Sequence, residues 1–185
     1  MSSPEELEAL LARCALKDRR AFARLYQLAS AKLFGLVLRI VKDEELANDV
    51  LQDGFVRIWN HAGEFRPEKA SPITWMGSIM RNRAIDLLRR ARTRMAIDTP
   101  VEELHWLEDD SVGSAAAEVD RVQSNRALKR CLERLSENQR QAISLAYFRG
   151  LTHEELARHL DTPLGTVKSW LRRGLLRLKD CLNEQ

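Results

Sequence analysis

Apolar residues recur at the period of an α-helix along nearly the whole chain, and the alternation typical of β-strands is almost absent. Eight glycines and five prolines interrupt the 185 residues, and most of them fall between the helical stretches. The clearest example is residues 21–41, where large apolar side chains return every three or four positions. This pattern predicts an all-α fold.

Capping and breaking signals divide the chain into helices. In the first half they predict four helices, over about residues 4–16, 21–41, 43–62 and 73–94. In the second half they predict four more, over about 118–134, 137–149, 153–160 and from 163 onward. Ser136 with Gln139, and Thr152 with Glu155, have the spacing of capping boxes, and Gly150 is placed to end a helix.

Charge is segregated along the chain, although the net charge is only +3. Residues 81–94 contain six arginines and one acid, whereas residues 95–118 contain seven acids and no lysine or arginine. Such blocks are more typical of separate modules than of one uniform globule. We predict two small helical domains, an N-terminal one over 1–94 and a C-terminal one over 119–185, joined by an acidic flexible linker over 95–118.

The C-terminal domain contains two helices joined by about three residues, which is typical of a helix-turn-helix. On a helical wheel, the second helix places five residues on one apolar arc: Leu164, Val167, Leu171, Leu175 and Leu178. The other side carries small polar and basic residues, with Lys168 at the flank: Gly165, Thr166, Ser169, Arg172, Arg173 and Arg177. A major groove needs small residues for close approach and arginines for phosphates or guanine edges. The alternative is an ordinary solvated helix face.

The helix predicted over 73–94 ends in arginines and lies beside Trp75 and a loop with two prolines. Basic residues next to an aromatic side chain and irregular backbone favour single-stranded or melted nucleic acid, whose bases can stack. Two alternatives stay open. Trp75 could be a core aromatic residue, and the arginines could be solvated charges that interact favourably with the end of a helix.

Several other classes of function are not expected. The segment His153–His159 resembles a zinc-protease motif, but position 157 is alanine, so we expect no metal site. No serine, histidine and acidic residue have the spacing of a hydrolase active site, and no glycine-rich loop indicates a nucleotide site. We therefore expect neither an enzyme nor a cofactor. The acidic N-terminus lacks the features of a signal peptide, and no run of 18 apolar residues predicts a membrane span.

Three cysteines, without metal-binding spacing, fit a reducing cytosol. Cys131 and Cys181 fall near the first and last helices of the C-terminal domain, which often lie close together in small bundles. The simpler interpretation is two buried, reduced thiols. The alternative is a disulfide that braces this domain or senses redox state.

Three segments together resemble the extracytoplasmic-function sigma factors, the small two-domain members of the sigma-70 superfamily. They are LANDVLQDGFVRIWNHAGEF, ITWMGSIMRNRAIDLLRR, and LSENQRQAISLAYFRGLTHEELARHLDTPLGTVKSWLRRGLLRLKDCL. The resemblance covers nearly the whole chain, in the order of the family. It implies a cytoplasmic protein that binds core RNA polymerase, directs it to promoter DNA, and is held inactive by an anti-sigma factor.

The resemblance also implies site residues. The promoter −35 element would be contacted in duplex form by Thr166, Lys168, Ser169, Arg172, Arg173 and Arg177. The −10 element would be opened and captured, with a flipped base, by Arg66, Lys69, Ser71, Trp75, Asn82 and Arg83. The polymerase would dock on Asp49, Gln52 and Asp53, which taken alone would be an ordinary polar helix face.

Two further functions remain as alternatives from the residues alone. One is a stand-alone helix-turn-helix regulator, which predicts specific duplex binding without polymerase. The other is a helical adaptor that binds only protein, which predicts no salt-dependent contact with nucleic acid. The polar segment LQDGF and the arginine-rich helix favour initiation with polymerase, because a simple repressor needs neither.

Overall fold

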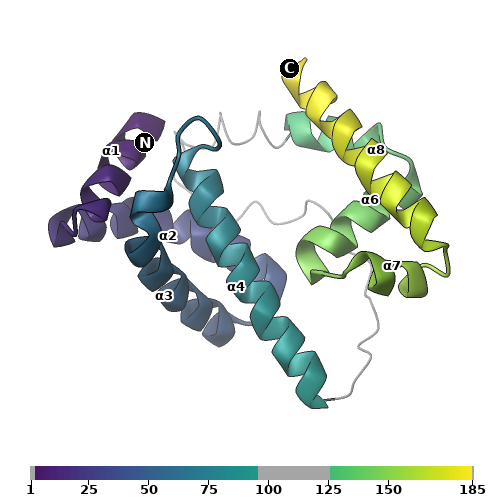
Figure 1. Ribbon diagram of the computed structural model, residues 1–185, viewed down its shortest axis with the longest axis horizontal. Helices are drawn as coiled ribbons and strands as arrows, with labels where there is room; N and C mark the ends of the chain where they lie inside the picture. Colours follow the sequence, from purple (N-terminus) through teal and green to yellow (C-terminus); the bar gives the residue numbers. More distant parts are fainter. Residues whose placement is uncertain (1–2, 96–125, 185) are drawn as a thin grey trace. The chain divides into compact units, whose positions relative to one another are not determined.

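The computed structural model describes residues 3–95 and 126–184, of which 92–95 are described by their backbone alone. The chain divides into two compact units, Met1–Asp98 and Thr99–Gln185 (Figure 1). Within the described ranges every regular element is helical, so the prediction of an all-α fold in two helical domains is confirmed. The predicted linker, 95–118, lies outside the described residues except for Met95.

The N-terminal unit contains four α-helices and one short 3-10 turn. They are α1 (Pro4–Ala15), α2 (Arg19–Val41), α3 (Glu44–His61), η1 (Ala62–Glu64) and α4 (Pro72–Met95). All four predicted helices are present, with ends that differ by no more than two residues from those expected. Local capping explains this agreement, since the side chains of Ser3, Asp18 and Asp43 each accept backbone N–H bonds at the start of a helix.

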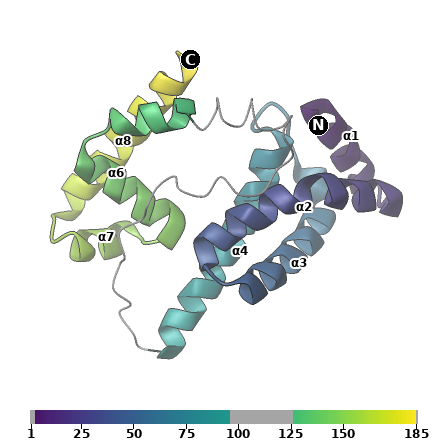
Figure 2. The ribbon, with the colours of Figure 1, turned by 180° about the vertical axis from the view of Figure 1, so that it is seen from behind.

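Helix α2 is the centre of this unit and packs against α1, α3 and α4 (Figure 2). Its buried side chains, among them Leu25, Leu33 and Val37, follow the helical period that the sequence displays. By length and mean hydropathy α2 could also cross a membrane. We attribute its apolar character to the core instead, because its buried face is covered by three other helices and its other positions carry arginines and Lys32.

Cys14 of α1 is a free, fully buried cysteine. Burial raises the pKa of its thiol to about 11, because the thiolate would lose its hydration. The neutral thiol is a poor nucleophile at physiological pH. Cys14 therefore behaves as a small core residue in the folded protein.

Helices α3 and α4 approach closely at Gly54, which lies within the LQDGF segment. A Cβ atom at position 54 would overlap Met80 Sδ and lie 2.8 Å from Met80 Cε. Met80 is fully buried, so its side chain has little room to move away. Glycine at this position is therefore a packing requirement of the α3–α4 contact.

We expect Gly54→Ala to lower the free energy of unfolding of the N-terminal unit by about 1–2 kcal/mol. The overpacking cost of about 1–3 kcal/mol exceeds the gain in helix propensity of up to about 1 kcal/mol. Gly35→Ala in α2 is the matched control, because nothing lies within 4 Å of a Cβ there, and it should stabilise. Urea unfolding of both variants measures the difference, and equal effects would contradict this packing role.

The described part of the C-terminal unit begins with a helix over 126–133; the predicted start of this helix, 118–125, lies outside the described residues. The remaining elements are α6 (Glu137–Ser144), a π-helical turn η2 (Leu145–Arg149), α7 (His153–His159) and α8 (Leu164–Asn183). Both predicted capping boxes are present. Gly150 ends η2 with a φ of 62°, a conformation that glycine adopts without strain. The predicted helix over 137–149 is thus α6 extended by the π-helical turn.

Helices α7 and α8 form the predicted helix-turn-helix, joined by residues 160–163. Pro163 is the N-cap of α8 rather than its first helical residue, and its carbonyl accepts the N–H bonds of Thr166 and Val167. The two helices pack through a cluster of buried residues: Ala142, Leu145, Leu156, Val167 and Leu171. This cluster fixes how α8 is held against α6 and α7.

The expected apolar arc of α8 is wrong at one position, since the side chain of Leu175 is 55% exposed. The buried face instead includes Gly174 and Cys181. Helix α6 comes so close that a Cβ at Gly174 would lie 2.7 Å from Ile143 Cδ1. This close approach turns the buried face toward Gly174 and leaves Leu175 outside it.

Cys131 and Cys181 are joined by a disulfide, with Cα atoms 5.8 Å apart. The bond links the helix over 126–133 to the C-terminal end of α8. Around it lies a second cluster of buried residues, formed by Leu132, Leu135 and Leu178 with the two cysteines. The unit therefore has one apolar cluster beneath the helix-turn-helix and another around the disulfide.

Candidate nucleic-acid and polymerase interfaces

The outward face of α8 carries the predicted duplex-contacting residues. Lys168, Arg172 and Arg173 are exposed, and Ser169 lies between them and is partly exposed. These four residues form what we call the α8 basic face. Buried Val167, at the centre of the helix-turn-helix cluster, fixes the helix rotation that points this face to solvent. Long cationic side chains around a small hydroxyl are suited to phosphates and base edges in a major groove.

Thr166 and Arg177 were also predicted to contact duplex DNA. Thr166 is partly exposed in the first turn of α8. Arg177 is exposed, but its Nη1 donates to Gln139 Oε1 at 3.4 Å. The same oxygen of Gln139 accepts from the backbone N–H of Ser136, within the capping box of α6. Arg177 therefore also ties α8 to α6, a role that the sequence pattern did not indicate.

In the N-terminal unit, α4 presents Trp75 and Asn82 along one side. The Trp75 ring is half-buried and packs edge-to-face on Phe65, with ring centroids 5.6 Å apart. Asn82 is exposed two turns further along. Trp75 thus combines both interpretations of the sequence, because one part of the ring packs on Phe65 while the rest stays accessible.

A cavity of about 180 Å³ lies between α3, η1 and α4. We call it the α3–α4 cavity, and its lining residues are Arg57, His61, Glu64, Trp75, Ile79, Asn82, Arg83 and Asp86. An aromatic ring, an amide and charges of both signs surround it, and His61 Nδ1 lies 2.9 Å from Glu64 Oε1. Stacking and hydrogen bonding to a polar aromatic ligand such as a nucleobase are both available here.

Three other predicted −10 residues lie in the loop that precedes α4, and two of them stabilise the protein itself. Arg66 Nη1 donates to the carbonyls of Gly63 and Phe65, at 2.8 and 2.9 Å. Ser71 Oγ accepts the backbone N–H of Thr74 at the start of α4. Lys69 is exposed. None of the three lines the α3–α4 cavity, so this cavity gathers only Trp75, Asn82 and Arg83 of the predicted set.

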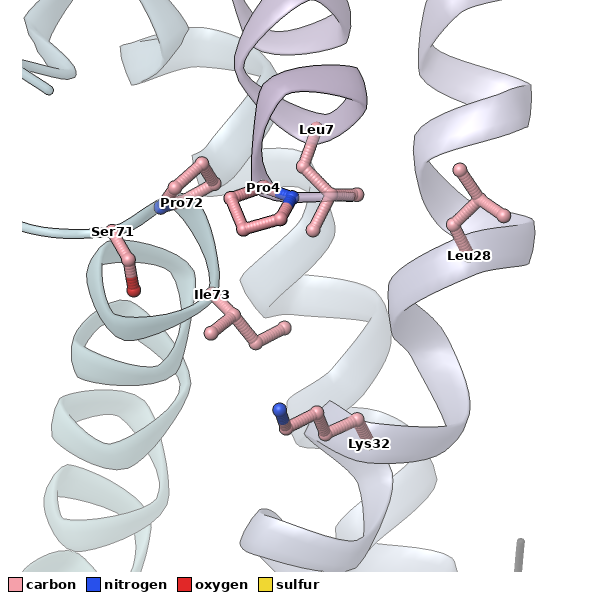
Figure 3. Close-up of a pocket in the computed structure, with 7 residues that line it drawn as sticks. All are labelled: Pro4, Leu7, Leu28, Lys32, Ser71, Pro72 and Ile73. Carbon is pink, nitrogen blue, oxygen red and sulfur yellow. The ribbon is translucent and has the colours of Figure 1, made fainter. Parts of the chain in front are cut away.

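A smaller pocket, of about 160 Å³, opens on the other side of the start of α4. Figure 3 shows that α1 contributes Pro4 and Leu7, α2 contributes Leu28 and Lys32, and the beginning of α4 contributes Pro72 and Ile73, with Ser71 just before it. The lining is mostly apolar. Lys32 and Ser71 supply its polar groups.

The predicted polymerase-docking residues Asp49, Gln52 and Asp53 are all exposed on α3, and we call them the α3 polar surface. Asp53 is also engaged within the protein. Its Oδ2 accepts from both Nε and Nη2 of Arg83 on α4, the Nε bond measuring 3.0 Å. The structure therefore joins a predicted polymerase contact to a predicted promoter contact by one ion pair, which no sequence pattern indicates across 30 positions.

Among the described residues, no group of three or more histidine, cysteine, aspartate or glutamate side chains could hold a metal ion. His153 and His159 both lie on α7, at its first and last residues. Glu155 closes the capping box of this helix. The structural role at the start of this helix therefore belongs to Thr152 and Glu155.

Comparison with protein families assigns the two units separately. Residues 25–94 match the family described as sigma-70 region 2, and residues 125–178 match sigma-70, region 4. The first match contains α3, the α3–α4 cavity and most of α4. The second contains the helix-turn-helix and the α8 basic face.

Curated relatives match nearly the whole chain. The ECF RNA polymerase sigma factor SigK of Mycobacterium tuberculosis (strain ATCC 25618 / H37Rv) is 33% identical over 180 residues, which cover 96% of this chain and 94% of the relative. SigK of Mycobacterium sp. (strain KMS) is 32% identical over 177 residues, which cover 96% of this chain and 91% of the relative.

Two solved structures are also similar. Rhodobacter sphaeroides SigE in complex with the anti-sigma ChrR is 32% identical, with a TM-score of 0.46, and the match covers 96% of this chain and 99% of that one. CnrH in complex with the cytosolic domain of CnrY is 23% identical, with a TM-score of 0.41 and coverage of 97% and 99%.

Proposed function

Because this chain belongs to the extracytoplasmic-function group of the sigma-70 family, we propose that it directs core RNA polymerase to specific promoters and initiates transcription there. The observation that supports the proposal is that two separate units present two surfaces of different chemistry. One is the α8 basic face, suited to duplex DNA, and the other is the α3–α4 cavity, suited to an unpaired base.

The α8 basic face is proposed to read the −35 element. Its support is the exposure of Lys168, Arg172 and Arg173 on the second helix of a helix-turn-helix, together with the match to region 4. Thr166 and Arg177 flank this face and are proposed to add contacts to the DNA backbone. Arg177 keeps donors for a phosphate besides the one that reaches Gln139.

The α3–α4 cavity is proposed to hold a base of the −10 element after strand opening. Asn82 supplies an amide that can pair with a base edge, and Trp75 supplies an aromatic surface. Arg66, Lys69 and Ser71 are proposed to lie along the strand just outside. Arg66 and Ser71 also hold the loop in shape, so replacing either would change the shape of the loop as well as its contacts.

Core RNA polymerase is proposed to dock on the α3 polar surface, where Asp49, Gln52 and Asp53 offer acceptors to cationic or N–H donors. We propose that the residues over 95–118 act as a tether whose negative charge is compatible with a channel that otherwise holds nucleic acid. The chain itself would catalyse no reaction. It would act in the cytoplasm, where core polymerase transcribes.

An anti-sigma factor is proposed as the controlling partner. A protein that covered the α3 polar surface or the α8 basic face would block polymerase or promoter, because both surfaces are exposed in the free chain. Co-expression with a bound inhibitor should then abolish initiation, and its removal should restore it.

Run-off transcription with core polymerase on genomic fragments tests the proposed function. We expect start sites that depend on the chain and share two sequence elements upstream. The alternative of a stand-alone regulator requires specific duplex binding without polymerase, which an electrophoretic mobility assay measures on the same fragments. Binding of that kind, without any start site, would replace the proposal with the alternative.

Replacing Asn82 by alanine should impair promoter opening by about 2- to 13-fold, the effect of losing a hydrogen bond of about 0.5–1.5 kcal/mol. Permanganate reactivity of unpaired thymines measures opening. Closed-complex binding should be unchanged, because the α8 basic face is intact. Ser78→Ala is the matched control, since Ser78 is an exposed polar residue one turn earlier on α4 that does not line the cavity. Equal opening by both variants would remove Asn82 from the site.

A further inference from the structure

The ion pair between Asp53 and Arg83 joins two surfaces that the proposed function treats as independent. Arg83 is only 18% exposed, whereas Asp53 is 55% exposed. The arginine thus lies between Asp53 on one side and the α3–α4 cavity, which it lines, on the other. A group that binds Asp53 from solvent can therefore act on the cavity through one side chain.

The geometry of the pair shows that the positive charge of Arg83 is neutralised by Asp53. Both Nε and Nη2 of Arg83 donate to the same oxygen, Asp53 Oδ2. An arginine held by a carboxylate presents little net charge to a phosphate, and the carboxylate itself repels an anionic strand. Asp86 and Glu64 also line the cavity, so the arginines there are the groups that favour an anion.

We propose that Asp53 masks Arg83 in the free protein, and that a docking partner which donates cationic groups to Asp53 unmasks Arg83 for the −10 strand. This inference rests on the proposed function, because it assigns Asp53 to the polymerase side and Arg83 to the promoter side. Because the Asp53 side chain is 55% exposed, salt screens the pair and the carboxylate stays hydrated when Arg83 leaves it. The cation supplied by the partner replaces Arg83 at the carboxylate.

Masking of Arg83 would make the free chain bind single-stranded DNA more weakly than its arginines alone would allow. Masking gives a physical reason why the free chain would bind melted DNA more weakly than the partner-bound chain. The coupling is reciprocal, because an anionic strand that draws Arg83 toward the cavity also frees Asp53 for the partner.

The test uses the full chain without polymerase and a short, fluorescently labelled DNA single strand of mixed sequence. Anisotropy gives the dissociation constant over a range of salt concentrations. We expect Asp53→Asn to bind more tightly than the natural chain by about 3- to 10-fold at low salt, with a salt slope steeper by about 0.7, as for one additional phosphate contact to a single strand.

Two further variants separate unmasking from a general loss of negative charge. Asp49→Asn removes a carboxylate from the same surface, and no ion pair of Asp49 occurs within the described part of the chain. Its gain should be smaller than that of Asp53→Asn. When Arg83 is already replaced by glutamine, Asp53→Asn should increase the affinity for the single strand by no more than Asp49→Asn does. Circular dichroism checks folding, and Asp53→Ser is a second neutral variant should Asp53→Asn not fold.

The masking proposal is overturned if Asp53→Asn behaves like Asp49→Asn, or if its gain persists with Arg83→Gln. Run-off transcription distinguishes this failure from failure of the proposed function. If the natural chain initiates transcription with polymerase but Asp53→Asn binds the single strand no more tightly, the proposed function stands and the masking proposal is wrong. If the natural chain never initiates transcription, the proposed function is wrong, and the polymerase and promoter roles assigned to Asp53 and Arg83 are wrong with it, whatever the affinity for the single strand.

Discussion

Reduction of the Cys131–Cys181 disulfide should lower the free energy of unfolding of the C-terminal unit by about 4 kcal/mol. The bond closes a loop with a sequence separation of 50 residues. In the chain-entropy account, a crosslink of this length removes about 4 kcal/mol of conformational freedom from the unfolded chain. In a unit of this size, such a loss corresponds to a fall in the thermal midpoint of more than about 10 °C.

Differential scanning calorimetry with and without a reductant measures this effect. The N-terminal unit supplies an internal control, because its only cysteine in the described structure, Cys14, forms no disulfide, and its transition should not respond to the reductant. A variant with Cys131→Ser and Cys181→Ser should unfold at the lower midpoint in both conditions. Equal midpoints of the natural chain with and without reductant would contradict a stabilising crosslink.

Thiol counting provides a separate check on the same bond. In the folded chain without reductant, Cys14 should react slowly, because it is buried and the pKa of its thiol is raised to about 11. After denaturation without reductant one thiol should react with an alkylating agent, and after reduction all three should. Three reactive thiols without a reductant would mean that Cys131 and Cys181 are reduced in the purified protein.

Most of the fold could be predicted from the sequence because helix ends depend on local interactions. The capping boxes at Ser136 and Thr152, and the caps at Asp43 and Gly150, each involve residues within a few positions of one another. Such bonds form wherever the local sequence permits them. The helical period of the apolar residues then decides which face each helix buries.

The errors come from tertiary packing, which no local pattern encodes. The wheel of α8 placed Leu175 in the core, but the close approach of α6 at Gly174 turns another side of the helix inward. The sequence of α8 alone does not show whether the leucine-rich face or the face centred on Gly174 is buried, because that depends on the neighbouring helix. Gly54 shows the same limit, because the reason for a glycine there is the side chain of Met80 on another helix.

The helix or loop that carries each candidate site residue could be predicted from the sequence, whereas its hydrogen-bond partners could not. The position of the α8 basic face follows from the helical period, so its residues lie where the sequence indicates. The predicted −10 residues come from a loop and from α4, and their hydrogen bonds depend on the folded structure. Arg66 and Ser71 form bonds within the protein, and Arg83 pairs with Asp53 on another helix. Residue type alone does not indicate which polar groups are already engaged.

Replacing Arg173 by alanine should weaken recognition of the −35 element by about 1–3 kcal/mol, or about 5- to 160-fold, if its guanidinium binds a base edge through two hydrogen bonds. Arg173 is exposed on α8, and no hydrogen bond of its side chain occurs within the described residues. Its five donors are therefore available to DNA. Because the side chain lies outside both apolar clusters, the variant should fold as the natural chain does.

The measurement is initiation by the complete complex with core polymerase on promoters with natural and altered −35 elements. Lys179→Ala is the matched control, because Lys179 is an exposed cation near the C-terminal end of the same helix. Loss of a phosphate contact weakens binding to all sequences alike, whereas loss of a base contact reduces the preference for one of them. Arg173→Ala should therefore lose discrimination at one base pair, and Lys179→Ala should retain it. If Arg173→Ala keeps full discrimination, α8 does not read the −35 sequence through this residue, and Arg173 contributes at most a contact to the DNA backbone.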